Sequence, residues 1–418
     1  MKYKLLFFIA LLMSSCNDGI KHQHPSKDLS TEAKKNPSVQ EFLNPAEIDK
    51  SHLPRLFSNG KQLYMSWVTS EKDTDFLNYS VYNGTIWNKT ETITQGTDWF
   101  TNWADFPVIC ENNGNILTTY LQKSDTATYA YDIRYNSYNS ETKTWHKNLL
   151  LNTDGTKTEH GFVSAVPVPG GFEVAWLDGR NTGGSHENHD KQGAGGAMTL
   201  RSAIITNDGE VLNEVQLDNR VCDCCQTSIA NSGRMTRIAY RDRSETEIRD
   251  ISVATKAVTG HLEKSIKKVH ADTWKIAGCP VNGPSIDAFG NSFVTAWFTA
   301  ADGEGKIKVS FLESDIQQPF RIDNGNATGR VDVEMISETD ALVLWMEPKG
   351  ESEVIMLAEV SISEGKTKEV QIFETTPDRA SGFPQLEVME ETAYVAWTDV
   401  EGKEKTVRTV AINLKDIE

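Results

Sequence analysis

The segment "SFVTAW", Ser292 to Trp297, decides the fold, because versions of it recur along the chain at regular intervals. Each version is a short, mostly apolar run that ends in Trp or Tyr. The others are "KQLYMSW" (ending at Trp67), "NILTTY" (Tyr120), "FEVAW" (Trp176), "TRIAY" (Tyr240), "ALVLW" (Trp345) and "TAYVAW" (Trp397). Successive aromatic ends are 53, 56, 64, 57, 48 and 52 residues apart. A period of this kind predicts a protein built from repeated units.

Each repeated run has further short strands around it. A segment that often begins with proline precedes it, as in "PRLFS" and "FPQLEV", and one or two more follow, as in "LNYSVYNG" and "TIWNKTETIT". Four strands in roughly 50 residues, with polar turns and no long helical pattern, are typical of a propeller blade. We therefore predict an all-β, seven-bladed β-propeller of four-stranded antiparallel blades. A six-bladed ring, with one unit misread, is the alternative.

The two ends of the repeat array predict how the ring closes. After "KTVRTVAINL" the seventh unit stops without a fourth strand, whereas "SVQEFLN", Ser38 to Asn44, is a spare strand before the first unit. If this strand completes the seventh blade, no blade is left without a partner and no sheet edge stays open at the junction.

The first residues, "MKYKLLFFIALLMSSC", have the order of a secretory signal, with Lys2 and Lys4 before an apolar run that is too short to cross a bilayer. The "LMSSC" stretch resembles a bacterial lipobox. It predicts a signal peptide over 1–15, lipidation at Cys16, a polar tether over 16–37 and the propeller over 38–418. The protein is then expected to be lipid-anchored in the bacterial envelope, either in the periplasm or on the outer-membrane surface.

The formal charge is −17, and removal of the two signal lysines makes it −19. A surface this acidic argues against nucleic acid as a partner.

Blade topology groups the chemically unusual loops on one face. In a meander of four strands, the loop that leads into the first strand and the turn that joins the second to the third lie at the same end. We call this end of the propeller the mouth face. It collects "NWADFP", "VCDCCQT", "AGCPVNGP", "YRDRSETEIRD" and the Gly- and His-rich "LDGRNTGGSHENHDKQGAGGAM", which is either a lid or an exposed loop. We expect the functional site there.

The first candidate group on this face is a set of cysteines. Cys222, Cys224 and Cys225 lie in "VCDCC", and Cys279 follows Cys225 by 54 residues, about one blade, so the four thiols belong to neighbouring blades. With His160, His186 or His189 they are candidates for a tetrahedral zinc or copper site. Disulfides are the first interpretation of these thiols, because an envelope compartment is oxidising, the metal site is the second and a redox role is the third.

The second candidate group is charged. Its candidate catalytic carboxylates are Asp178, Asp242 and Asp332. Its candidate substrate-binding residues are Arg180, Arg241, Arg243, Arg330, Arg379 and Asp105. Arginines that converge on a funnel offer bidentate donors to carboxylate, sulfate or phosphate, and the aspartates are suited to acid–base chemistry or to binding sugar hydroxyls. Ion pairs that tie neighbouring blades together are the alternative for each of these residues.

The chain resembles the sialidase-like superfamily of β-propellers with BNR or Asp-box repeats, and within it envelope lipoproteins that carry "CxCC" with "WLDGR", "YRDR" and "GRVD". Degenerate Asp-box-like turns are present at "SYNSETKTW" and "SDIQQPF". The resemblance implies a glycan-facing propeller in which three arginines hold a sialate carboxylate, an aspartate is the acid/base and a tyrosine paired with a glutamate is the nucleophile.

Arg241 or Arg243, Arg330 and Arg379 are the residues that would form this arginine group. The Arg-Ile-Pro motif of sialidases has no clear counterpart in "SHLPRLF". We therefore keep three hypotheses: a glycan-binding lipoprotein that acts as a sialidase-like exo-glycosidase, a non-catalytic binding or scaffold propeller, and a copper- or zinc-binding envelope protein.

Overall fold

The computed structural model describes residues 39–46, 50–183, 196–257, 265–312 and 318–417. The proposed signal peptide, Cys16 and the tether lie outside these residues, as do His186 and His189. In the described part of the chain, the helical segments are too short and too polar to serve as membrane spans.

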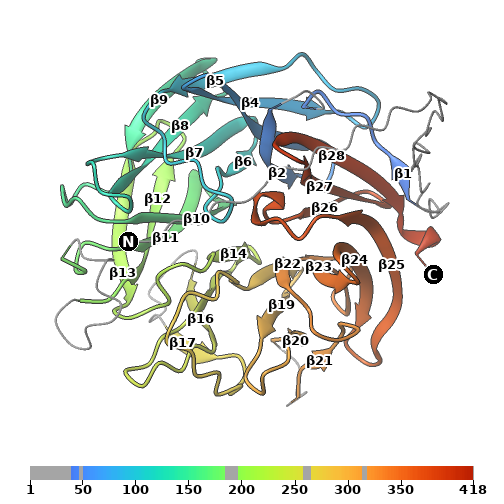
Figure 1. Cartoon of the computed structure of the whole chain (residues 1–418). Helices are drawn as coiled ribbons and strands as arrows, with labels where there is room; N and C mark the ends of the chain where they lie inside the picture. Colours follow the sequence, from blue (N-terminus) through green and yellow to red (C-terminus); the bar gives the residue numbers. More distant parts are fainter. Residues whose placement is uncertain (1–38, 47–49, 184–195, 258–264, 313–317, 418) are drawn as a thin grey trace, which may run out of the picture. The chain divides into compact units, whose positions relative to one another are not determined.

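Seven four-stranded antiparallel sheets are arranged around one axis (Figure 1), which confirms the predicted seven-bladed propeller and excludes six blades. Blade 1 contains β2 (Ser51–Ser58), β3 (Leu63–Glu71), β4 (Thr74–Tyr82) and β5 (Glu91–Gly96). Blade 2 contains β6 (Ile109–Asn112), β7 (Asn115–Lys123), β8 (Tyr131–Asn139) and β9 (Thr144–Leu150). Blade 3 contains β10 (His160–Val168), β11 (Gly171–Asp178), β12 (Thr199–Thr206) and β13 (Val211–Asp218).

The remaining blades repeat this order. Blade 4 contains β14 (Ser228–Asn231), β15 (Met235–Arg241), β16 (Ile251–Ala257) and β17 (Ser265–Lys268). Blade 5 contains β18 (Ser285–Phe289), β19 (Ser292–Thr299), β20 (Lys306–Phe311) and β21 (Phe320–Arg321). Blade 6 contains β22 (Gly329–Met335), β23 (Asp340–Lys349), β24 (Ser352–Ser361) and β25 (Gly365–Thr375). Blade 7 contains β26 (Gln385–Met389), β27 (Thr392–Glu401), β28 (Glu404–Asn413) and β1 (Gln40–Glu41), and the short 3-10 helices η2 (Arg379–Ser381) and η3 (Leu414–Asp416) flank it.

The ring closes as the sequence predicts. Strand β1 pairs with β28 in antiparallel register, with Gln40 opposite Ala411 and Glu41 opposite Val410. The contact continues beyond the strand, since the Asn44 side-chain amide donates to Thr409 Oγ1 at 2.9 Å. The N-terminal and C-terminal segments of the propeller therefore share one sheet, and opening the ring requires breaking that sheet.

The repeated aromatic residues form the cores between blades. Five tryptophans at the predicted positions are at most 2% exposed, namely Trp67, Trp176, Trp297, Trp345 and Trp397. Within the described ranges, the apolar core is divided into seven clusters, each shared by two neighbouring blades. The smallest lies between blades 4 and 5 and has only five buried members: Ala230, Ala239, Val253, Ile286 and Phe293. This interface has the least hydrophobic burial to stabilise it.

Phe42, the residue after the closing strand, makes aromatic contacts with both of the blades that meet there, including Trp87 of blade 1 at 5.6 Å. Phe42 packs against Tyr394 of blade 7 at a centroid distance of 5.0 Å and against Tyr82 of blade 1 at 4.9 Å. We predict that Phe42→Ala lowers the free energy of unfolding by about 2 kcal/mol, since half-buried aromatic surface and three aromatic pairs are lost. Leu43→Ala is the matched control, because that side chain is 72% exposed. Equal denaturant midpoints for the two variants would contradict the role of Phe42 in closure.

Candidate functional site

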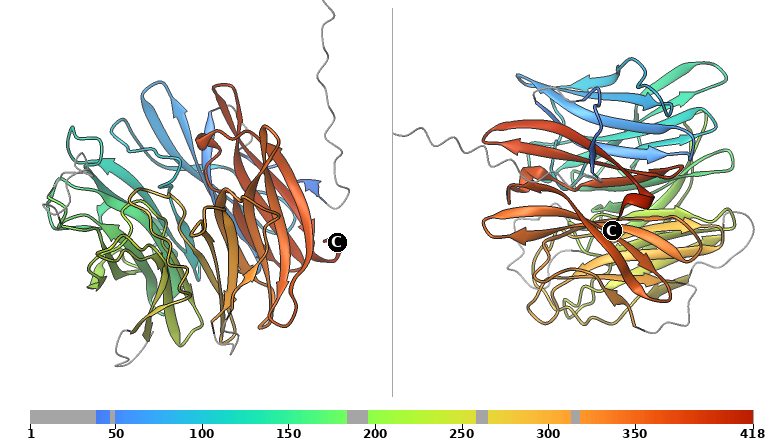
Figure 2. Two further views of the ribbon diagram at one scale, coloured as in Figure 1. Left: turned by 60° about the horizontal axis from the view of Figure 1, so that its bottom comes forward. Right: turned by 90° about the vertical axis from the view of Figure 1, so that its right-hand side faces the viewer.

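The first strands of the seven blades converge on an axial cavity below the mouth face. It is lined by side chains from all seven blades, among them Arg55, Asp105, Phe162, Gln226, Ser285, Asp332 and Phe383. Figure 1 looks along this axis, and Figure 2 shows from two sides how the twisted sheets stand around it. The cavity has a volume of about 40 Å³, which is room for a few water molecules rather than for a whole sugar ring.

Asp105 is the carboxyl group in this cavity with unused bonding capacity. Its Oδ1 accepts a hydrogen bond from the Phe162 amide at 2.8 Å, and its Oδ2 has no hydrogen-bond partner among the described residues although the side chain is buried. Burial raises the pKa of Asp105 well above its ordinary range, and nearby Glu159 acts in the same direction against the Phe162 hydrogen bond. The group is thereby favoured in its protonated form, as a general acid requires.

The backbone beneath Asp105 explains how the carboxyl group reaches this position. A side chain added at Gly161 would place its Cβ 2.0 Å from Asp105 Oδ2. Only glycine leaves room for the carboxyl group against the first strand of blade 3.

An aromatic platform lies next to the cavity. We use this name for Trp103 and Phe383, whose rings stack at 6.0 Å with an interplanar angle of 14°. The Arg330 guanidinium lies 5.0 Å from the Trp103 ring centroid and donates to Ser381 Oγ and Gly382 O, both at 2.8 Å. Burial lowers the pKa of Arg330 to about 10, and the positive charge of Arg379 acts in the same direction. Arg379 itself is exposed on η2.

Below the mouth, the first strands carry carboxyl groups that face one another. We call Asp287, Asp332, Glu334 and Glu387 the acid collar. Asp332 bridges blades, since its two oxygens accept from Ser285 Oγ and from the Leu386 amide, each at 2.9 Å. Burial, reinforced by the neighbouring carboxylates, raises the pKa of Glu387 to about 8 and that of Asp287 to about 6.

Burial likewise raises the pKa of Asp332, and it raises that of Glu334 with the help of its acidic neighbours. Arg55 is a counter-charge in the collar, since it lowers the pKa of three of its members.

The four predicted cysteines converge at a second site on the mouth face. The Sγ atoms of Cys222, Cys224 and Cys225 lie within 4.8 Å of one another, with Cys222 and Cys225 at 2.8 Å. Cys279, from the loop that leads into blade 5, lies close enough to Cys224 for each thiol to affect the pKa of the other. None of the five cysteines in the described ranges forms a disulfide.

A buried arginine, Arg249, lies beside the thiols and donates to Cys222 Sγ at 3.3 Å. Burial opposes ionisation of Cys222, but hydrogen bonds from Cys224 and Cys225 and the charge of Arg249 hold its pKa well below the ordinary value. The hydrogen bond from Cys224 lowers the pKa of Cys279 against burial. For Cys224 the hydrogen bonds with its three cysteine neighbours raise the pKa, and for Cys225 burial is the largest cause of a rise.

The arginines expected to hold substrate in blade 4 have structural partners instead. Arg241 is 2% exposed, and its guanidinium donates to the carbonyls of Asn282, Arg249 and Phe298 at 2.7–2.9 Å. Arg243 pairs with Asp223 at 2.7 Å and with Glu247 at 2.8 Å. Arg241 thus stabilises the junction of blades 4 and 5 through backbone carbonyls, whereas Arg243 pairs with carboxylates of its own blade. Among the described residues, neither side chain forms the ion pair between blades that was the alternative interpretation.

The three candidate catalytic aspartates are not brought together. Asp332 alone among them lines the axial cavity. Asp242 lies after the second strand of blade 4, where burial and Asp218 raise its pKa and it accepts from Ser252 Oγ at 3.2 Å. Asp178 ends the second strand of blade 3, where it accepts two hydrogen bonds from Arg180, from Nε at 2.7 Å and from Nη2 at 2.8 Å.

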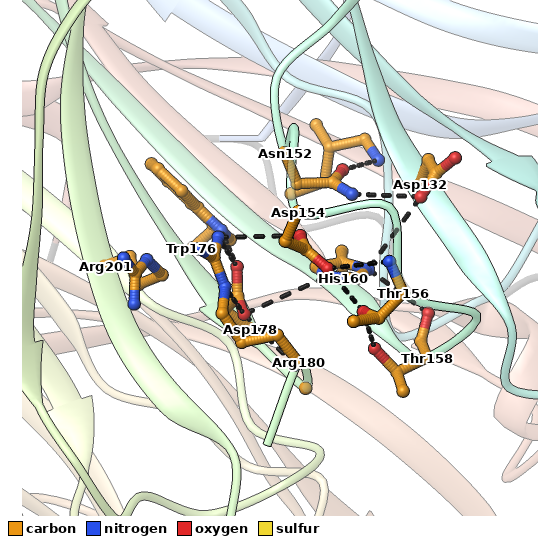
Figure 3. A network of polar contacts seen from close by, with 12 residues as sticks. Asp132, Asn152, Asp154, Thr156, Thr158, His160, Trp176, Asp178, Arg180 and Arg201 are labelled. Atoms are coloured by element: carbon orange, nitrogen blue, oxygen red, sulfur yellow. Dashed lines mark hydrogen bonds and ion pairs between the residues drawn. The ribbon is translucent and has the colours of Figure 1, made fainter. Parts of the chain in front are cut away.

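His160 lies outside the cysteine group, in the network of blade 3 shown in Figure 3. Its Nδ1 contacts the carbonyls of Tyr131 and Thr158 at 3.1 and 3.2 Å, so Nδ1 must carry the proton. Its Nε2 lies 3.1 Å from Asp154 Oδ2 and 3.9 Å from Asp178 Oδ1. These atoms have the chemistry of a cation site, but Arg180 already supplies a positive charge to both aspartates.

A buried tyrosine–glutamate pair is present that the sequence did not reveal. Tyr131 Oη donates to Glu159 Oε1 at 2.6 Å. Tyr131 is 1% exposed, stacks on Phe100 at 4.2 Å and is not among the residues that line the axial cavity. Burial and the adjacent Glu159 raise its pKa well above the ordinary value. Both effects disfavour the phenolate and hence a nucleophilic role.

Sequence reasoning missed several residues for identifiable reasons. Arg55 and Arg249 are present in the segments "PRLFS" and "YRDRSETEIRD", but nothing local distinguishes an arginine that faces an axis from one that faces solvent. The acid collar does have a signal, since charged residues alternate with apolar ones in "RVDVEMI" on a strand expected to be innermost. Trp103 and Phe383 are 280 residues apart in the chain, and only ring closure brings them into contact.

Comparisons with known proteins concern the fold. No family model matches the chain, and no curated protein matches it. Among solved structures, the polysaccharide lyase Uly1 is 11% identical, with 92% of this chain and 94% of that chain covered and a TM-score of 0.51. The alpha-L-arabinofuranosidase Arb93A from Fusarium graminearum is 10% identical, with 91% and 98% covered and a TM-score of 0.49.

A neuraminidase-like protein of A/little yellow-shouldered bat/Guatemala is also 10% identical, with 90% of this chain and 98% of that chain covered and a TM-score of 0.47. At these identities the likeness shows the architecture alone.

The acid collar predicts how stability depends on pH. Because the pKa of Glu387 is raised, the folded chain still holds a proton there at pH values where the unfolded chain has lost it. The stabilisation of the folded state by this proton is present at low pH and is lost as the pH rises toward about 8. We predict that Glu387→Gln raises the Tm by about 3 °C at pH 9 and by less than about 1 °C at pH 5. The exposed Glu390 provides the control Glu390→Gln, and a Tm shift in Glu387→Gln that is independent of pH would refute this account.

Proposed function

We propose that the axial cavity and the aromatic platform bind a sugar at the end of a glycan, and that the protein acts on it as an exo-glycosidase with Asp105 as the general acid. The observation that carries this proposal is the buried carboxyl group of Asp105, which lines the cavity with one oxygen unpartnered and with its protonated form favoured. A protonated carboxyl group in such a place is suited to donate a proton to the leaving oxygen of a glycosidic bond.

The size of the cavity sets the binding mode. A volume of about 40 Å³ admits one substituent of a sugar but not its ring. The ring is therefore placed at the mouth, against the partly exposed Trp103, with one polar group reaching toward Asp105 and Arg55. Arg55 has an unpartnered Nε among the described residues, so it has a donor available for a carboxylate or a hydroxyl group. Arg330 and the exposed Arg379 add positive charge on the platform side, which favours an anionic sugar.

The proposed arginine group differs from the one expected from the sialidase resemblance. Arg55 replaces Arg241 and Arg243, because the guanidinium of Arg241 is used by backbone carbonyls and that of Arg243 by two carboxylates. A binding propeller without turnover is the second candidate, and it is favoured by the full pairing of Asp332, the other aspartate that lines the cavity. Measuring binding and hydrolysis separately distinguishes the two.

We predict that Asp105→Asn lowers hydrolysis of aryl sialosides or of uronic acid glycosides by about 10²–10⁴-fold while binding changes little, because asparagine keeps the acceptor for Phe162 and loses the acid. The substrates are tested as a panel by release of the aryl group and by calorimetry. Asp125→Asn, on an exposed turn of the same face, is the control. Full activity in Asp105→Asn would exclude its role as the acid, and binding without turnover in the native protein would favour the second candidate.

We also propose that the chain is an envelope lipoprotein anchored through Cys16, as the order of charge, apolar run and cysteine at its start suggests. Cys16→Ser in the full-length chain is expected to abolish incorporation of labelled palmitate and to move the protein from the membrane fraction to the soluble fraction. Cys110→Ser, which changes a cysteine inside the propeller, is the control. Retention of the Cys16→Ser protein in washed membranes would count against the anchor.

A further inference from the structure

The cysteine group has no role in the proposed glycan chemistry, yet it brings together four of the five cysteines in the described ranges. Three come from the loop between β13 and β14, and the fourth comes from the next blade. The loop is fixed in place, since the Cys222 amide donates to Arg241 O at 2.9 Å and the Val221 amide donates to Met198 O at 3.0 Å. The three thiols are therefore held by backbone contacts that do not involve their sulfur atoms.

The arrangement is one cluster rather than two separate pairs. The Sγ atoms of Cys222, Cys224 and Cys225 lie within 4.8 Å of one another, and Cys279 lies close enough to Cys224 to affect the pKa of that thiol. Two disulfides would need each sulfur to have one partner, whereas a central ion needs four sulfurs that face a common point. Zinc and copper(I) are the ions that thiolate ligands select.

The charges around the cluster suit thiolates. Arg249 is 1% exposed, and its Nη1 donates to Cys222 Sγ at 3.3 Å. A buried guanidinium beside a sulfur stabilises the negative charge that several thiolates retain after one cation has bound. Carboxylates balance the neighbouring arginines, since Glu247 pairs with both Arg243 and Arg249 and Asp223 pairs with Arg243.

The cluster is open to solvent at one cysteine and lies at a junction between two blades. Cys222 and Cys225 are buried, whereas Cys279 is exposed, so an ion has a route to the cluster from the mouth face. The cluster also joins blades 4 and 5, the junction with the smallest apolar core in the described structure. A bond between these blades through a metal would stabilise the interface that burial stabilises least.

We propose that Cys222, Cys224, Cys225 and Cys279 bind one thiophilic d10 metal ion, zinc(II) or copper(I), which links blades 4 and 5 at the mouth face. Binding replaces the thiol protons with metal–sulfur bonds and releases those protons to solvent, with no change in oxidation state. The site is distinct from the axial cavity, so it stands or falls independently of the proposed glycan function.

The test uses the folded chain reduced with a phosphine and freed of metal, with zinc and copper(I) added in separate arms against a competing chelator. We expect one equivalent of at least one ion to bind, with a rise in Tm of about 5 °C, and cobalt(II) to give the ligand-field bands of a tetrahedral thiolate site. Cys279→Ser, an exposed position, should weaken binding at least about tenfold. Cys110→Ala, in the first strand of blade 2, should leave it unchanged.

The arm that binds more tightly identifies the ion. Stoichiometric uptake that Cys279→Ser leaves unaltered would overturn the four-sulfur site. Failure of the reduced, folded chain to take up either ion would overturn the proposal altogether, whatever disulfides the oxidised protein contains. Circular dichroism of each variant verifies that it is folded before its metal content is compared.

Discussion

The convergence of seven first strands on one axis is the constraint on which the rest of the structure depends. Sheets that radiate from an axis are widely spaced at the rim and crowded at the centre, so the rim tolerates loops of any length while the centre admits few side chains. The ring must also close, and the pairing of β1 with β28 supplies that closure. The cavity, the acid collar and the aromatic platform are all consequences of this geometry.

The same geometry explains why carboxyl groups at the centre resist ionisation. Asp287, Glu334 and Glu387 belong to the first strands of neighbouring blades, and Asp287 disfavours the charged forms of both glutamates in addition to the effect of burial. Arg55 compensates only part of this charge. A chain with a formal charge of −17 thus contains carboxyl groups inside the ring whose protonated form is favoured by burial.

The fold could be predicted from the sequence because the chain repeats one strand pattern seven times. The spacing of the aromatic residues from Trp67 to Trp397 reflects one buried position per blade. A spare strand at one end of the chain and a missing strand at the other predict that the two ends pair and close the ring. The faces of the blades follow from the same topology, which is why the cysteines were expected together. His160 was expected with them and is not, because its ring is fixed by backbone carbonyls within blades 2 and 3.

The partners of individual charged side chains could not be predicted, because they depend on distances across blades that no local pattern encodes. Arg241, Arg243 and Arg55 all belong to segments close to the mouth, yet two of them are fully engaged and one retains a free donor. The difference follows from packing: blades 4 and 5 share little apolar surface, so polar contacts replace it there. Arg241 donates to carbonyls of blade 5 and the thiols of both blades meet at the same junction. Buried arginines and thiols thus occupy the junction with the smallest apolar core, whereas the axial cavity is lined by residues of all seven blades.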